Sequence, residues 1–249
     1  MNTRIGMPSL AVALAVLAGM CACTIDGNER AREVRTESQS VDLGGAKSAR
    51  VEIKMGAGKL KVGGGARSPN QLLDADFTYN VPRWKPEVNY SRSGDQGRLT
   101  IEQPSGGGPH GNTRYEWDLR LATKIPMEMT VEMGAGRADL TLGSLALTSL
   151  HVELGAGETN LDLTGEWKND LIAHIEGGVG KATVRLPRDV GVRVKAEGGL
   201  GSISAGDFKR DGSYYVNDAY GKSPVTLEVD VEGGVGQIVL ELGEAPGVV

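Results

Sequence analysis

A Gly-x-Gly triplet that recurs six times restricts the possible folds of this chain more than any other feature. Residues that alternate between apolar and polar precede and follow every copy. The glycine pairs are Gly56/Gly58, Gly134/Gly136, Gly155/Gly157, Gly178/Gly180, Gly199/Gly201 and Gly234/Gly236. Four consecutive copies are separated by 21, 23 and 21 residues, a spacing typical of solenoid repeats.

Alternation with a period of two predicts strands that turn one face toward a core and the other toward water. Aligned on the triplet, the column three places upstream is Ile53, Val131, Val152, Ile175, Ala196 and Val231, and a downstream column is Leu60, Leu140, Leu161, Val184, Ala205 and Leu240. Stacked strands lie about 4.8 Å apart, so such columns form continuous apolar ladders. We therefore predict an all-β, single-domain, right-handed parallel β-solenoid with Gly-x-Gly corners.

The glycines suit a strand that turns a corner directly against the next corner, because glycine has no Cβ and accepts positive φ. A phosphate-binding loop is the alternative at Gly178-Val-Gly-Lys181. It fails on spacing, because Ala182 follows the lysine and the required upstream glycine is missing.

Two longer intervals interrupt the repeat. Residues 59–133 contain additional strand-like segments, and Phe77, Trp84 and Trp117 are predicted to close one end of the core. Residues 207–224 are predicted to form a protruding loop or hairpin, which repeat proteins often place on their binding face.

The N-terminus has the pattern of an export signal. An uncharged apolar stretch from Leu10 to Met20 is too short to span a bilayer, and Ala22 precedes Cys23 as lipoprotein processing requires. We predict a lipoprotein signal peptide over 1–22, a lipidated Cys23 with a polar tether over 23–40, and a solenoid domain over 41–249. Cys21 is the second choice for lipidation, and a plain secretory signal is the alternative.

Lipidation predicts an extracytoplasmic protein held in the bacterial cell envelope by its N-terminal acyl chains. Thr24 after the cysteine favours the outer membrane if the cell has two. An acylated Cys23 would leave no free thiol for disulfides, metal ligation or nucleophilic catalysis. The net charge of -5 argues against a nucleic-acid partner.

Several segments resemble the toast-rack domain family, which is related to extracytoplasmic adhesin-type β-solenoids and to LiaF-like cell-wall stress response proteins. The matching features are the Gly-Ala-Gly and Gly-Val-Gly triplets, residues 77–90, residues 117–136, and Leu186-Pro187 followed by residues 190–194. The resemblance implies a stacked β-solenoid with no catalytic residues. A lipoprotein signal in place of several transmembrane helices separates this chain from the LiaF-like proteins.

Two outward columns contain the first group of candidate interaction residues. If the rungs stack in sequence order, His151 lies over His174, and Glu153 and Glu176 belong to a ladder of glutamates beside them. A divalent cation that bridges these carboxylates with help from imidazole is one interpretation. A solvated polar face is the other, and we predict neither a metal site nor a cofactor.

Tyr214, Tyr215 and Tyr220 form the second group, within the 207–224 insertion. Their composition suits contacts with a sugar or a protein. Alternatively, the tyrosines fold over the side of the solenoid and shield it.

We predict a non-enzymatic envelope lipoprotein that acts as an adhesin-like or scaffold solenoid, with an unknown envelope protein or glycan as partner. The second hypothesis is an accessory protein of a cell-envelope stress response that binds a membrane protein. A carbohydrate-active β-helix enzyme ranks last, because the acidic residues are distributed from rung to rung rather than gathered in one cleft.

Overall fold

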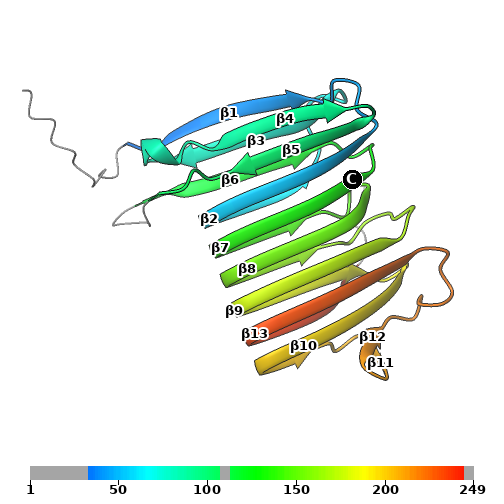
Figure 1. Cartoon of the computed structure of the whole chain (residues 1–249). Helices are drawn as coiled ribbons and strands as arrows, with labels where there is room; N and C mark the ends of the chain where they lie inside the picture. Colours follow the sequence, from blue (N-terminus) through cyan, green and yellow to red (C-terminus); the bar gives the residue numbers. More distant parts are fainter. Residues whose placement is uncertain (1–32, 107–112, 244–249) are drawn as a thin grey trace, which may run out of the picture.

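A computed structural model describes residues 33–106 and 113–243 (Figure 1). These residues form an all-β structure in which one mixed network of thirteen strands is accompanied by a single short 3-10 helix, Pro82–Trp84. The strands are β1 Arg35–Asp42, β2 Ser48–Gly64, β3 Gln71–Tyr79, β4 Glu87–Ser93, β5 Gln96–Glu102, β6 Tyr115–Leu121, β7 Met127–Thr141, β8 Leu147–Asp162, β9 Leu171–Pro187, β10 Gly191–Ser204, β11 Lys209–Asp211, β12 Tyr214–Val216 and β13 Thr226–Gly243.

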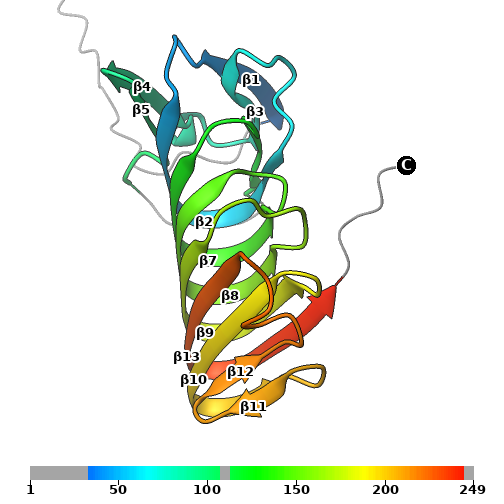
Figure 2. The ribbon, with the colours of Figure 1, turned by 90° about the vertical axis from the view of Figure 1, so that its right-hand side faces the viewer.

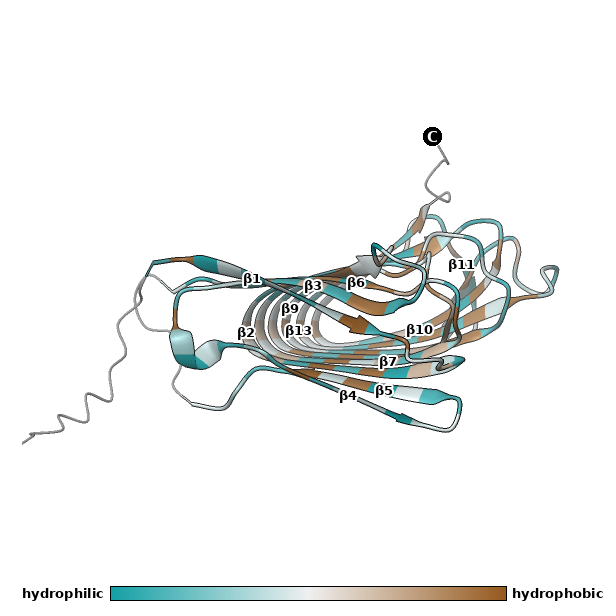
Figure 3. Ribbon diagram, turned by 90° about the horizontal axis from the view of Figure 1, so that it is seen from above, coloured by the Kyte–Doolittle hydropathy of each residue, from teal (hydrophilic) through white to brown (hydrophobic). Residues whose placement is uncertain are grey.

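Six long strands carry the Gly-x-Gly triplets and form the body of the molecule. In stacking order these are β2, β7, β8, β9, β13 and β10, and each pairs with its neighbours in parallel (Figure 2). Each strand bends at its triplet, so that from above the strands lie inside one another as U-shaped curves (Figure 3). We call the part before the triplet the N-arm and the part after it the C-arm. The apolar core lies between the two arms.

The last position of every triplet must be glycine for two reasons, its positive φ and its close contact with backbone of the adjacent strand. Gly157 has a φ of +134°, and a Cβ added to it would lie 1.9 Å from the carbonyl oxygen of Gly136 on the preceding rung. Gly180 stands in the same relation to Gly157, at 1.8 Å. The first glycine is almost as confined, since a Cβ on Gly155 would lie 2.5 Å from the oxygen of Gly134. The predicted Gly-x-Gly corners are therefore confirmed.

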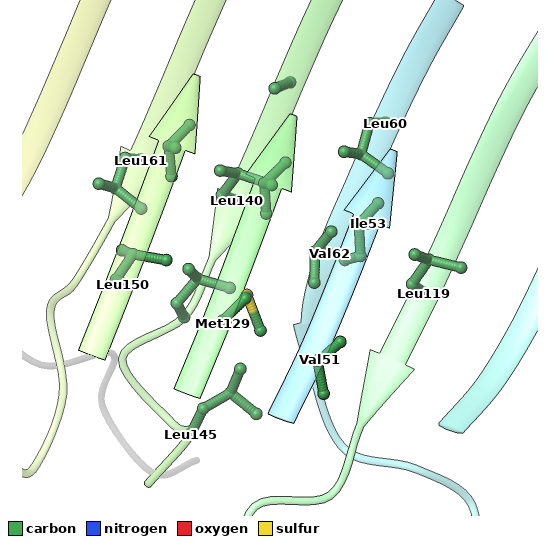
Figure 4. Close-up of a cluster of buried hydrophobic side chains, with 14 of the residues drawn as sticks. Val51, Ile53, Leu60, Val62, Leu119, Met129, Leu140, Leu145, Leu150 and Leu161 are labelled. Carbon is green, nitrogen blue, oxygen red and sulfur yellow. The ribbon is translucent and has the colours of Figure 1, made fainter. Parts of the chain in front are cut away.

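The inward columns form the core, as predicted. The upstream ladder runs through Ile53, Val131, Val152, Ile175, Val231 and Ala196. Figure 4 shows Ile53 of this ladder beside the next inward column of the N-arms, Val51, Met129 and Leu150, together with side chains of the C-arms such as Val62, Leu140 and Leu161. One alignment was wrong: Val62, not Leu60, pairs with Leu140, and Leu60 pairs with Ala138.

The stacking order departs from the sequence order at one place. Strand β13, which carries the last triplet, lies between β9 and β10 and pairs with both. On its other edge, β10 pairs with β12 over Arg193–Lys195. The chain then returns as β13, which inserts between β9 and β10 and does not add to the outer edge of β10. Glu176 is therefore next to Glu232 rather than Glu197.

The prediction of a purely parallel stack is wrong at the N-terminal end. Strand β5 pairs in parallel with the N-arm of β2, and β6 pairs in parallel with its C-arm. Together β5 and β6 therefore resemble one rung that is interrupted at its bend. Here the Gln103 side chain replaces a neighbouring bend, because its Oε1 accepts hydrogen bonds from the amides of Gly56 (2.7 Å) and Ala57 (3.3 Å). Strands β4, β3 and β1 continue outward in antiparallel pairing.

Aromatic residues close this end of the core, as predicted. Phe77 and Trp117 meet edge to face at 5.5 Å, and Trp84 packs in the same way against Tyr115 at 5.5 Å. All four side chains are buried. At the other end, residues 207–224 contain the predicted hairpin, made of β11 and β12.

Replacing a bend glycine tests the role of the corner. We expect Gly157→Ala to lower the free energy of unfolding by about 3 kcal/mol or more, because it adds both a steric clash and an unfavourable φ. For a chain of this size that is a fall in Tm of roughly 6–12 °C. The matched control is Gly177→Ala, whose Cβ would meet nothing nearer than 3.9 Å. Calorimetry that gave both variants the same Tm would contradict this account.

Candidate interaction surface

The glutamate ladder forms on the outer face of the N-arms. We call Glu132, Glu153, Glu176, Glu232 and Glu197 the acidic strip, and each is in register with the next. A lysine lies near each end: Lys54, in register with Glu132, has its Nζ 4.0 Å from that carboxylate, and the Nζ of Lys195, two residues before Glu197 on β10, lies 2.9 Å from Glu197. The three central glutamates, which include the candidates Glu153 and Glu176, are exposed and form no ion pair with any described residue.

The two end lysines are held in their charged form. A hydrogen bond with Glu52 raises the pKa of Lys54, and the nearby charge of Glu132 acts in the same direction. A hydrogen bond with Glu197 likewise raises the pKa of Lys195. Positive charge is therefore fixed at the two ends of the strip, and the negative charge at its centre has no partner within the described part of the chain.

The histidine column lies beside the acidic strip. His151 pairs with His174 across adjacent rungs, as the sequence predicted. On its other side His174 faces Asp230, and its Nδ1 lies 3.4 Å from Asp230 Oδ2 with both side chains about half exposed. If the rungs stacked in sequence order, Lys195 of β10 would occupy this place instead. The imidazole thus has a carboxylate neighbour that the sequence did not predict.

The cation hypothesis gains no support from this arrangement. Within residues 33–106 and 113–243, no group of three or more His, Cys, Asp or Glu side chains is placed to hold a metal ion. Neighbours in register on one face of a sheet point in the same direction, whereas Ca²⁺ requires six to eight oxygen ligands that converge on a point.

The outer face of the C-arms differs from that of the N-arms. Arg137 binds Asp139 at 2.8 Å and Glu158 at 2.9 Å, and Asn160 Nδ2 donates to Asp139 at 2.9 Å. Lys61 lies 3.4 Å from Asp118. Charges on this face are largely paired within the sheet, so the acidic strip distinguishes the N-arm face.

The three candidate tyrosines do not all lie on one surface. Tyr214 pairs with Lys195 and points outward, so it lies at the end of the N-arm face. The guanidinium carbon of Arg193 lies 4.5 Å from the centre of its ring. The hydroxyl of Tyr220 interacts with the same guanidinium. Tyr214 and Tyr220 therefore extend the surface that carries the histidines and glutamates.

Tyr215 takes the shielding role. It pairs with Val194, an inward-facing residue, and packs partly buried against the core. Nearby, the buried side chain of Asn217 ties this segment to the preceding turn: its Nδ2 donates to Val190 O at 2.7 Å, and its Oδ1 accepts from Val192 N at 3.0 Å. Sequence reasoning missed this anchor, since an Asn in a polar loop gives no signal of burial.

A cavity inside the bend was also missed. The residue immediately before the triplet points into the bend and is Met55, Met133 or Leu154 in β2, β7 and β8, but Gly177, Gly233 or Gly198 in β9, β13 and β10. The glycines leave a cavity of about 230 Å³. The change from Met-Gly-Ala-Gly to Gly-Gly-Val-Gly is visible in the sequence and was the available signal.

The predicted lipidation site, Cys23, the alternative Cys21 and the signal peptide over 1–22 lie outside the described residues. Within the described ranges, the structure has no helix with the length and hydropathy to cross a membrane.

Strands that stack in parallel and bend at paired glycines, with polar outer faces, define a class of all-β repeat proteins. Residues 30–185 match the family model of the N-terminal domain of toast_rack, DUF2154. A solved structure of a "putative cell adhesion protein" from Clostridium sporogenes ATCC 15579 is 38% identical, with a TM-score of 0.79 over 85% of this chain and 100% of that one. This chain belongs to the toast-rack family.

More distant structures also match. A "putative adhesin" from Bacteroides fragilis NCTC 9343 is 10% identical, with a TM-score of 0.31 over 84% of this chain and 97% of that one. Another from Parabacteroides merdae ATCC 43184 is 11% identical, with a TM-score of 0.25 over 83% and 96%. No curated protein matches the chain.

The Asn217 anchor predicts a stability effect. Asn217→Ala would leave the buried Val192 amide and Val190 carbonyl without partners, which should cost about 2–3 kcal/mol. The control is Asp218→Ala next to it, because the Asp218 side chain is 76% exposed and forms an exposed ion pair with Lys209; we expect a change within about 0.5 kcal/mol. Equal urea midpoints for the two variants would show that the anchor is unimportant.

Proposed function

We propose that this chain is a non-enzymatic envelope lipoprotein that presents its N-arm face, as an adhesin-like scaffold, to a protein partner with a basic surface. The observation that carries the proposal is the centre of the acidic strip: Glu153, Glu176 and Glu232 are adjacent, exposed and without ion pairs among the described residues. The relationship to a solved structure named as a "putative cell adhesion protein" supports the same class of function.

Unpaired like charges in register weaken a sheet by an amount that is small but unfavourable. The C-arm face avoids this cost by pairing its charges, as Arg137 does with Asp139 and Glu158. A basic partner would neutralise the strip, and a uniform patch of charge speeds encounter and fixes orientation. Tyr214 and Tyr220 at the end of the same face would add aromatic contacts.

The arrangement favours binding over catalysis. The carboxylates of the strip lie one per rung on an open face, whereas glycoside hydrolysis uses two carboxylates that face each other across a sugar. The enzyme hypothesis therefore stays last.

The anchor in this proposal is Cys23, lipidated and extracytoplasmic, with the polar tether after it. Strand β1, where the described chain begins, lies at the opposite end of the stack from β10 and β12 (Figure 1). A lipid at the N-terminus would therefore attach the aromatic end to the membrane and direct the β10 end away from it.

Photo-crosslinking in intact cells tests the proposed face. A photoreactive amino acid at Glu176 or Tyr214 should capture one specific protein, identified by mass spectrometry. The same probe at Thr183, on the outer face of a C-arm, is the control. Capture of a membrane signalling protein would favour the stress-response hypothesis, and equal capture from all three positions would contradict a dedicated N-arm interface.

Charge removal tests the role of the acidic strip directly. The triple variant Glu153→Gln, Glu176→Gln and Glu232→Gln should reduce capture at Tyr214 at least tenfold. Its Tm should stay the same or rise slightly, because repulsion worth roughly 0.2–1 kcal/mol per pair is removed. Arg137→Gln on the C-arm face is the control, and it should leave capture unchanged.

The proposed lipid anchor at Cys23 has its own test. Cys23→Ala should move the chain from the membrane fraction to the soluble fraction and abolish metabolic labelling with an alkyne fatty acid. Cys21→Ala should do neither. The reverse pattern would assign lipidation to Cys21, and labelling of neither cysteine in the unaltered chain would refute the lipoprotein assignment.

A further inference from the structure

The interior of the bend changes character once along the stack. In β2, β7 and β8 it is filled by Met55, Met133 and Leu154, which are 2–4% exposed. In the next three strands of the stack the same inward position is Gly177, Gly233 and Gly198. Three adjacent rungs therefore lack the side chain that fills the bend elsewhere.

The backbone does not require these three glycines. None has a φ in the left-handed region. A Cβ on Gly177 would meet nothing nearer than the Glu232 oxygen at 3.9 Å, and one on Gly198 nothing nearer than Ile203 at 3.9 Å. On Gly233 it would lie 3.2 Å from the tip of Ile238, a flexible side chain. The fold would therefore accept side chains at these three positions, and the sequence nevertheless has glycine there.

The space left behind is largely apolar. The residues around it include Leu154, Thr159, Ile175, Ala182, Ile203 and Ile238, together with glycine backbone, and the polar residues Glu176, Lys181, Ser202, Glu232 and Gln237 border it as well. At about 230 Å³, the cavity exceeds the roughly 150 Å³ apolar cavity that stays dry and accepts benzene in another protein. Water gains too few hydrogen bonds in such a place, whereas hydrocarbon fits it.

The cavity reaches the end of the stack. Within the described ranges, β12 covers β10 only over Arg193–Lys195, so no strand lies outside residues 196–204. Ile203 belongs to an inward column with Ile238 yet is 36% exposed, while Ile238 is 4% exposed. The last rung therefore forms an apolar mouth. Three rungs span about 10 Å between the first and the last.

We propose that this cavity binds a single unbranched hydrocarbon chain, inserted end-on through the mouth at β10. Its width is the space of one missing side chain per rung, and its length follows the stacking direction. That shape suits an acyl chain whose polar end remains in solvent beside Ser202. Two residues of the acidic strip, Glu176 and Glu232, also border the cavity, but the proposal does not depend on their charge.

Fluorescence titration with dansyl-labelled undecanoic acid tests the proposal. The full chain carries Cys21→Ser and Cys23→Ser, so that no acyl group of its own competes. We expect saturable enhancement that dodecanoic acid reverses, and a rise in Tm with dodecanoic acid. Gly177→Leu should weaken binding at least tenfold while Tm is kept or raised, because it fills the cavity with the side chain that Leu154 has on the adjacent rung.

Ile172→Ser is the matched control. Ile172 is 53% exposed on the outer face of β9 and does not line the cavity, so this change should leave the affinity within twofold. Loss of binding in Ile172→Ser but not in Gly177→Leu would place the probe on the outer face and overturn the proposal. Absence of saturable enhancement would also overturn it. If Gly177→Leu fails to fold, Gly233→Leu serves as the second cavity-filling variant.

The source of the chain is distinguished by flotation with phosphatidylglycerol vesicles. Co-flotation that Gly177→Leu abolishes would identify a bilayer lipid as the source. Displacement of the probe by dodecanoic acid without co-flotation would identify a free fatty acid. Both results support the cavity as an acyl-chain site.

Discussion

The whole stack depends on the close approach of backbone to backbone at the bend. At Gly136, Gly157, Gly180, Gly236 and Gly201, an added Cβ would lie 1.7–2.0 Å from the carbonyl oxygen of the adjacent rung. No side chain can be accommodated there, and the strand must reverse at positive φ. Because all six bends coincide, both arms of every rung keep the same register, and the apolar ladders on the two sides can be continuous.

One change of residue types at the bend explains both the cavity inside it and the row of exposed apolar side chains outside it. In the first three rungs of the stack a large side chain lies inside the bend and an alanine, Ala57, Ala135 or Ala156, lies at the middle of the triplet. In the last three the inside position is glycine, and the middle position is Val179, Val235 or Leu200 at 58%, 47% and 73% exposure. Apolar volume has moved from the inside of the bend to the outside, so the cavity and the exposed ridge arise together.

The sequence predicted the local structure well and the order of the rungs poorly. Period-two alternation around each triplet located the inward columns and placed His151 next to His174. The same regularity makes the repeats interchangeable: Val231 fits beside Ile175 as well as Ala196 does, so nothing local placed β13 between β9 and β10. The neighbour of His174 was mispredicted for this reason. Leu60 was misaligned because it lies nearer to the second glycine of its triplet than the other members of its predicted column do, so it pairs with Ala138 and not with Leu140.

The two ends of the stack meet the same problem, an open sheet edge, in different ways. At the β2 end, Gln103 caps the bend amides, aromatic side chains fill the core, and antiparallel strands extend both arms. At the β10 end, the hairpin held by Asn217 covers only the N-arm. Within the described residues, the uncovered part of β10 includes the bend whose interior lacks a side chain, so closing it with a strand would also close the cavity. An edge left open at that place in the described structure is consistent with a ligand that enters there.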